Sequence, residues 1–228
     1  MPYILRPQGR FMHLVSLVPQ LLPAKELAAF LVVICFAAGI NVYATMLTLG
    51  ILSHFQILAL PPGLHVLDNW YVLGVCGILF LVEFAGDKIP VFDLLWNSLH
   101  TFVRIPVAAL MAYAATSQLP EWERLLATLL GSLIALAAHG GKTAARAAVT
   151  PSPEPFSNVT LSLSEDAGVA FLLWFATRHP YSAAAIVGVL LLTIAVMIRV
   201  VALALANLFR GTESALAKDG HASGHPVH

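Results

Sequence analysis

Apolar stretches long enough to cross a bilayer, separated by short polar segments, make up most of this chain. A helix needs about 20 apolar residues to span a hydrocarbon core about 30 Å thick. Hydrophobic windows predict an all-α, polytopic integral membrane bundle of about six spans. The predicted spans cover residues 26–55, 70–85, 91–115, 123–149, 161–175 and 182–209.

Two of these predicted spans are interrupted near their middles. The Gly-Ile-Asn segment 39–41 interrupts the first span, which is also too long for one perpendicular helix at about 1.5 Å per residue. The His-Gly-Gly segment 139–141 interrupts the fourth span. Broken helices at corresponding places in two halves are typical of transporters built from inverted repeats. We therefore expect halves at residues 26–117 and 121–210, related as a 3+3 inverted repeat.

A polar stripe runs along the third predicted span, which is otherwise apolar. Asp93, Asn97, His100 and Arg104 follow one another at spacings of four, three and four, so they share one helix face. An ionisable side chain at membrane depth is costly and usually faces a bundle interior or an aqueous path. The stripe is therefore predicted to face protein or water, and to mark a functional site.

Three further polar groups map to the same predicted membrane side as this stripe, and we expect all four to form one binding site of mixed charge. The further groups are Glu83, Asp87 and Lys88 at the end of the second span, His139, Lys142 and Arg146 on the fourth, and Glu154, Asn158, Glu165 and Asp166 before and within the fifth. No catalytic signature or metal-ligand spacing occurs, so we expect neither a metal nor a cofactor.

The segment at residues 150–158 carries three prolines in five residues. Proline removes a backbone donor and restricts the residue before it, so this segment is predicted to be extended and non-helical. Irregular backbone at membrane depth is tolerated where it lines a cavity. We expect the segment to form a wall or gate of the site.

For several of these residues a purely structural role is the alternative to a binding role. Ser162 and Glu165 fit a capping box, and Glu165 with Asp166 fits an acidic first helical turn. Asp93 fits a helix cap after a proline. Lys142 and Arg146 fit topology signals at a cytoplasmic boundary.

Small residues indicate where helices approach one another closely. Ala127, Gly131 and Ala135 recur at every fourth position on one face of the fourth span. Two glycine pairs are expected to act in the same way: Gly39 with Gly50, and Gly74 with Gly77.

Composition agrees with a membrane protein and excludes some classes of function. The chain of 228 residues is 59% hydrophobic and 11% charged, with a formal net charge of +0. The chain has no excess of basic residues that would indicate nucleic-acid binding. Cys35 and Cys76 lie in apolar runs, where we expect packing roles. Residues 1–25 are expected to form an interfacial arm, residues 26–210 the transmembrane domain and residues 211–228 a disordered tail.

The polar segments resemble a bacterial membrane-protein family known as domain of unknown function 4126. The resemblance lies in Glu83-Phe-Ala-Gly-Asp-Lys-Ile-Pro90, in the stripe from Asp93 to Arg104, in His139-Gly-Gly-Lys142 with Arg146, in Ser152-Pro-Glu-Pro-Phe-Ser-Asn158, and in Ser164-Glu-Asp166. It implies a compact polytopic protein and no settled activity. A bacterial cytoplasmic membrane is the expected location, and the distribution of Lys and Arg predicts both termini in the cytoplasm.

The function predicted from these features is a small membrane transporter or channel-like protein. In this hypothesis carboxylates or a histidine take up a proton or cation, and basic side chains meet an anionic substrate. The alternative is an intramembrane enzyme acting on a lipid or isoprenoid phosphate, and a third is an accessory subunit whose charges only join helices. The expected partners are the lipid bilayer and a small ion or anion, with homo-oligomerisation left open.

Overall fold

The computed structural model describes residues 24–86, 90–149 and 155–222, and every regular element in these segments is a helix. Side chains are described for most of them, with gaps at 87–98, 147–158 and parts of 201–222. The elements are α2 (Ala24–Ile40), α3 (Val42–His54), the 3-10 helix η1 (Pro62–Asp68), α4 (Trp70–Gly86), α5 (Pro90–Ala115), α6 (Glu121–Val149), α7 (Pro155–Arg178) and α8 (Pro180–Ala222).

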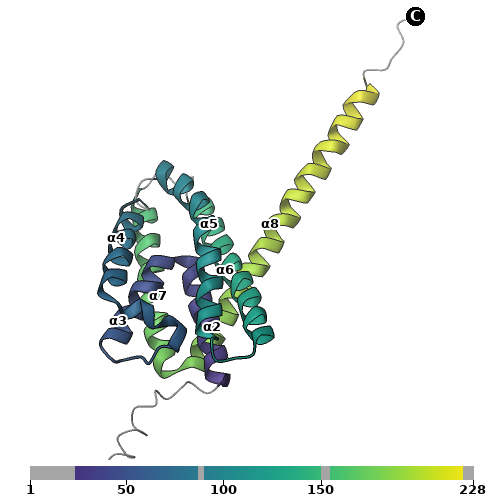
Figure 1. The fold of residues 1–228 in the computed structure, drawn as a ribbon. Coiled ribbons are helices and arrows are strands. Elements are labelled where there is room, and N and C mark those ends of the chain that lie inside the picture. Colours follow the sequence, from purple (N-terminus) through teal and green to yellow (C-terminus); the bar gives the residue numbers. More distant parts are fainter. Residues whose placement is uncertain (1–23, 87–89, 150–154, 223–228) are drawn as a thin grey trace, which may run out of the picture.

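The predicted break in the first hydrophobic segment is confirmed, but the segment takes a different path from a simple span. Asn41 has extended backbone angles (φ −149°, ψ 105°), and its side chain accepts a hydrogen bond from the Ala44 amide at 2.9 Å to cap α3. The chain then turns back, and α3 runs toward the end from which α2 started (Figure 1). Accordingly Glu26 of α2 and Leu58, which follows α3, line one cavity of about 320 Å³.

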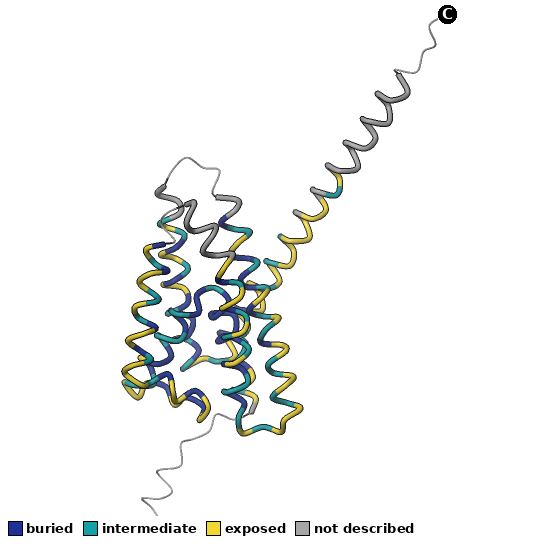
Figure 2. The backbone as a smooth tube through the Cα atoms, turned by 45° about the horizontal axis from the view of Figure 1, so that its top comes forward, coloured by how far each residue is buried: buried dark blue, intermediate teal, exposed yellow. Residues whose placement is uncertain are grey.

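The turn between α2 and α3 lies in the middle of the bundle. Helix α2 packs against α5, α6, α7 and α8, while α3 packs against α4, η1 and α7. Figure 2 shows the buried backbone concentrated along these two helices, with exposed positions on the outer faces. The core includes Phe30, Val33 and Ile34 of α2 and Leu49 of α3. Both halves of the broken segment are therefore held as core elements.

The outer surface is apolar, as expected for a protein surrounded by lipid. On α6 alone the exposed side chains include Leu125, Leu129, Leu133 and Leu136. Among the described residues, three helices are long and apolar enough to cross a membrane: Glu121–Arg146, Val159–Arg178 and Pro180–Val200. Pro62–Asp68 together with Trp70–Gly86, bent by 69°, makes a fourth candidate. The predicted six spans are not confirmed: the helix Val42–His54 is apolar but shorter, and of α5 only the apolar part Leu99–Ala115 lies among the residues with described side chains.

The predicted break at residues 139–141 is wrong, because α6 is one continuous helix from Glu121 to Val149. Glycine inside a helix costs only about 1 kcal/mol relative to alanine, which tertiary packing readily offsets. Gly141 supplies such packing, since a Cβ there would lie 2.7 Å from Cγ1 of Ile194 on α8. Gly141 therefore allows α8 to approach closely, and it does not interrupt α6.

Helix α7 also starts earlier than the sequence predicted. Pro155 opens the helix, where its fixed φ and missing N–H are tolerated, so residues 155–158 are helical and not extended. Ser162 and Glu165 consequently lie well inside α7, and the capping-box interpretation is wrong. Helix α8 likewise continues past the predicted end at residue 209 as far as Ala222.

The predictions about small residues are confirmed on α2, α3 and α6 and wrong on α4. A Cβ at Gly39 would lie 2.8 Å from Cα of Ala135, and one at Gly131 would lie 2.7 Å from Sγ of Cys35. Gly50 packs equally closely on the backbone of η1. A Cβ at Gly74 or Gly77 would meet nothing within 4 Å, because this face of α4 points outward.

The two ends of the described chain lie far apart. The start of α2 and the end of α8 lie at opposite ends of the molecule (Figure 1). That both termini lie in the cytoplasm stays a prediction.

Candidate functional site

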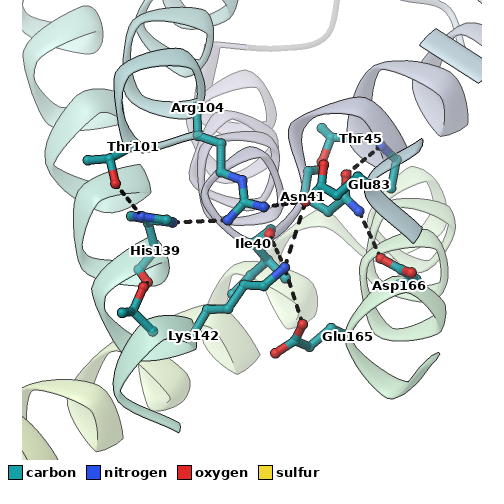
Figure 3. Close-up of polar contacts among 12 residues, drawn as sticks. Ile40, Asn41, Thr45, Glu83, Thr101, Arg104, His139, Lys142, Glu165 and Asp166 are labelled. Atoms are coloured by element: carbon teal, nitrogen blue, oxygen red, sulfur yellow. Dashed lines mark hydrogen bonds and ion pairs between the residues drawn. The ribbon is translucent and has the colours of Figure 1, made fainter. Parts of the chain in front are cut away.

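Charged side chains from four helices meet at the turn between α2 and α3 (Figure 3). The described ionised groups are Glu83 of α4, Arg104 of α5, Lys142 and Arg146 of α6, and Glu165 and Asp166 of α7. All are buried except Glu165, whose side chain is 12% exposed. We refer to these six residues as the charged cluster.

A fully buried ion pair joins α4 to α5. Glu83 and Arg104 are both 0% exposed, and Nη2 of Arg104 donates to Oε1 of Glu83. Arg104 reaches this position because it lies on the buried face of α5, with His100 one turn before it and Ala108 one turn after it. A buried charge is tolerated only with a partner, so each residue requires the other.

His139 of α6 continues the network from Arg104. Its Nδ1 lies 3.0 Å from Nη1 of Arg104, and its Nε2 lies 2.7 Å from Oγ1 of Thr101. A guanidinium group only donates hydrogen bonds, so Nδ1 of His139 must accept. The ring is then the neutral tautomer with its proton on Nε2, which donates to Thr101. Two residues of α5 thereby fix the orientation of this imidazole.

Lys142 lies among oxygen atoms from three different helices. Its Nζ is 3.1 Å from the carbonyl oxygen of Ile40, 3.2 Å from Oε2 of Glu165 and 3.8 Å from Oε1 of Glu83. Ile40 is the last residue of α2, where the helix dipole presents its negative end. Arg146 binds the same oxygen of Glu165 at 2.6 Å.

Asn41 ties the turn to α7. Its Nδ2 donates to Oδ1 of Asp166 at 2.8 Å, and its carbonyl oxygen accepts from Oγ1 of Thr45 at 2.8 Å. Asn41 and Thr45 are both 0% exposed. Close by, the ring of Tyr43 meets His100 edge to face, with centroids 5.6 Å apart. The backbone carbonyls at the turn therefore accept hydrogen bonds from side chains, that of Ile40 from Lys142 and that of Asn41 from Thr45.

The carboxylates and basic groups of the cluster are equal in number, and the second oxygen of Glu83 differs from the first. Three carboxylates, those of Glu83, Glu165 and Asp166, face the three basic groups of Arg104, Lys142 and Arg146. In the part of the chain that the structure describes, Oε2 of Glu83 is buried and accepts no hydrogen bond. A buried acceptor without a donor costs about 1–3 kcal/mol, so this oxygen is available to a ligand.

The structure brings together eight of the predicted site residues: Glu83, His100, Arg104, His139, Lys142, Arg146, Glu165 and Asp166. The side chains of Asp87, Lys88, Asp93, Asn97, Glu154 and Asn158 lie outside the described residues. Sequence reasoning missed Asn41, Thr45, Thr101 and the carbonyl of Ile40 as members of the site. Asn41 was recognisable as the one amide in an apolar run, and Thr101 as the residue one turn before Arg104.

Comparison with known proteins identifies the family. A family model described as Domain of unknown function (DUF4126) matches residues 28–200. The chain belongs to this family. The DUF4126 region contains every residue of the charged cluster, which confirms the resemblance seen in the sequence. No curated protein and no solved structure matches the chain.

Proposed function

We propose that this DUF4126 protein is a small integral membrane transporter or channel-like protein, and that the charged cluster binds an ion or a small anionic substrate. The observation that carries the proposal is the position of the cluster. Glu83, Arg104 and Lys142 have side chains that are 0% exposed inside a bundle whose outer surface is apolar. Ionisable residues at such depth are expensive to keep and usually mark a pathway or a site.

The broken helix pair supports the same proposal. Helix α2 ends and α3 begins within the cluster, so the carboxyl end of one helix and the amino end of another both face it. Half-helices that end at a buried site are a recurrent device in secondary transporters, where their dipoles and unpaired backbone groups meet the substrate and the ion. The side-chain cap of Asn41 keeps this turn ordered.

The finer architecture belongs to the same proposal. We retain a 3+3 inverted repeat of residues 26–117 and 121–210 as a hypothesis, with a helix break in the first half only. We place the protein in the bacterial cytoplasmic membrane, and the end that carries Lys142 and Arg146 toward the cytoplasm, because basic residues are enriched on that side.

Flux measurements in proteoliposomes test this proposal. Vesicles containing the purified protein and an internal pH dye are given a potassium diffusion potential, in chloride, phosphate or sulfate buffers. We expect ion or proton flux above that of protein-free vesicles. Glu83→Gln and Glu165→Gln should each lower the flux at least tenfold, because each removes a carboxylate of the cluster.

A matched control variant is available at the other end of the bundle. Glu121 forms an ion pair with Arg124 at 2.9 Å, but its side chain is 60% exposed. Glu121→Gln makes the same chemical change outside the cluster and should leave flux unchanged. Equal flux in the wild type, all three variants and empty vesicles would contradict the proposal.

A further inference from the structure

The oxygen atoms around Lys142 resemble the coordination shell of a cation. The carbonyl of Ile40, Oε2 of Glu165 and Oε1 of Glu83 converge on Nζ from α2, α7 and α4 (Figure 3). Backbone carbonyls and carboxylates are also the groups that bind inorganic cations in channels and transporters. The ammonium group of Lys142 occupies the place where such an ion would lie.

This shell contains more acceptor capacity than Lys142 uses. Oε2 of Glu83 is buried and, over the described part of the chain, has no hydrogen-bond donor. It belongs to the carboxylate whose other oxygen faces Lys142. A lysine ammonium has three N–H donors on one tetrahedral atom, whereas a bare cation can be coordinated by both oxygens of one carboxylate. An inorganic ion can therefore satisfy an oxygen that Lys142 leaves unsatisfied.

The ammonium group of Lys142 indicates the valence of the ion. It brings a single positive charge to the oxygens of Ile40, Glu165 and Glu83. A monovalent cation that replaces it leaves the charge of the shell unchanged. A divalent ion would add one positive charge, which is costly in a buried site.

We propose that Ile40, Glu83 and Glu165 form a site for one monovalent alkali cation, which the ammonium group of Lys142 fills in this conformation. The inference rests on the proposed function and names its coupling ion. An ammonium group is close in size to K⁺ and Rb⁺, so the site favours these ions over Na⁺ and Li⁺. Lys142 and the cation compete for the same oxygens, and its flexible stem lets the side chain leave when an ion enters.

Thermal unfolding of the full-length protein in detergent tests the site without a transport assay. The variant Lys142→Met removes the ammonium group and keeps an unbranched side chain. Its melting temperature is measured in KCl, RbCl, NaCl and choline chloride at equal ionic strength. At a K⁺ concentration ten times the dissociation constant, ligand binding should raise the melting temperature by about 3–6 °C relative to choline.

Three proteins serve as comparisons. The wild type should show a much smaller response to K⁺, because Lys142 occupies the site. Lys142→Met combined with Glu165→Gln should lose the response, because a coordinating carboxylate is gone. Lys25→Met changes an exposed lysine at the start of α2 and should behave as the wild type.

Identical melting of Lys142→Met in KCl and choline chloride would refute the site. If the variant is unfolded in choline chloride, purification in KCl should restore the folded protein, and a variant unfolded in both salts would also refute the site. The flux assay separates the two proposals. A K⁺ response without flux supports the cation site and contradicts transport. Flux without a K⁺ response supports transport and contradicts the cation site.

Discussion

Glu83→Gln should be among the most destabilising single substitutions in this protein. The change removes a charge without changing the shape of the side chain, and it leaves Arg104 and Lys142, both with side chains 0% exposed, facing one carboxylate fewer. Breaking a buried pair by removing one partner costs about 3–5 kcal/mol, because the remaining charge stays buried without compensation. We expect a loss of that size in the free energy of unfolding.

The assay is equilibrium unfolding in mixed micelles, followed by tryptophan fluorescence. Glu121→Gln is the matched control, since its ion pair with Arg124 is exposed and such pairs contribute about 0.2–1 kcal/mol. The double variant Glu83→Gln with Arg104→Met should cost less than the sum of the two single variants, because it removes both charges together. Equal losses for Glu83→Gln and Glu121→Gln, with additive single effects, would refute the buried-pair argument.

Two further predictions concern the α2–α3 turn and its packing. Gly39→Ala should destabilise the fold by about 1–3 kcal/mol, because its Cβ would lie 2.8 Å from Cα of Ala135, whereas Gly74→Ala should be neutral or stabilising by up to about 1 kcal/mol, because nothing lies within 4 Å. Comparing the unfolding free energies of the two variants checks this, and equal effects would contradict the packing. Asn41→Ala should cost about 1–3 kcal/mol, because it removes the α3 cap and the donor to Asp166. Hydrogen exchange at the first amides of α3 measures this directly, and unchanged protection there would count against the cap.

Hydrophobic patterning predicted most of the helices to within a few residues. The windows 70–85 and 91–115 correspond to α4 (Trp70–Gly86) and α5 (Pro90–Ala115). Glycine and proline were less informative about where helices end, because each residue occurs in more than one structural role. Gly141 provides room for Ile194, and Pro155 starts a helix where an extended segment was expected. Local sequence does not show which neighbour a glycine admits.

The candidate site was predictable where it followed helix periodicity. His100 and Arg104 lie one turn apart on a buried face, and Lys142 and Arg146 do so on α6, as their spacing required. The pairing between helices was not predictable, because no spacing in the chain relates Glu83 to Arg104 or Asn41 to Asp166. Those partners are set by which helices pack together.

Sequence alone thus determined that the chain is helical, apolar on its outer surface and polar along a few helix faces, because these properties depend on residues within one or two turns of each other. Only the tertiary structure decided that α2 and α3 fold back at Asn41 and that the charges meet there. The physical reason is the cost of burying charge. A lone Glu83 or Lys142 is unfavourable inside the bundle, and each becomes tolerable only where helices distant in sequence supply its partner.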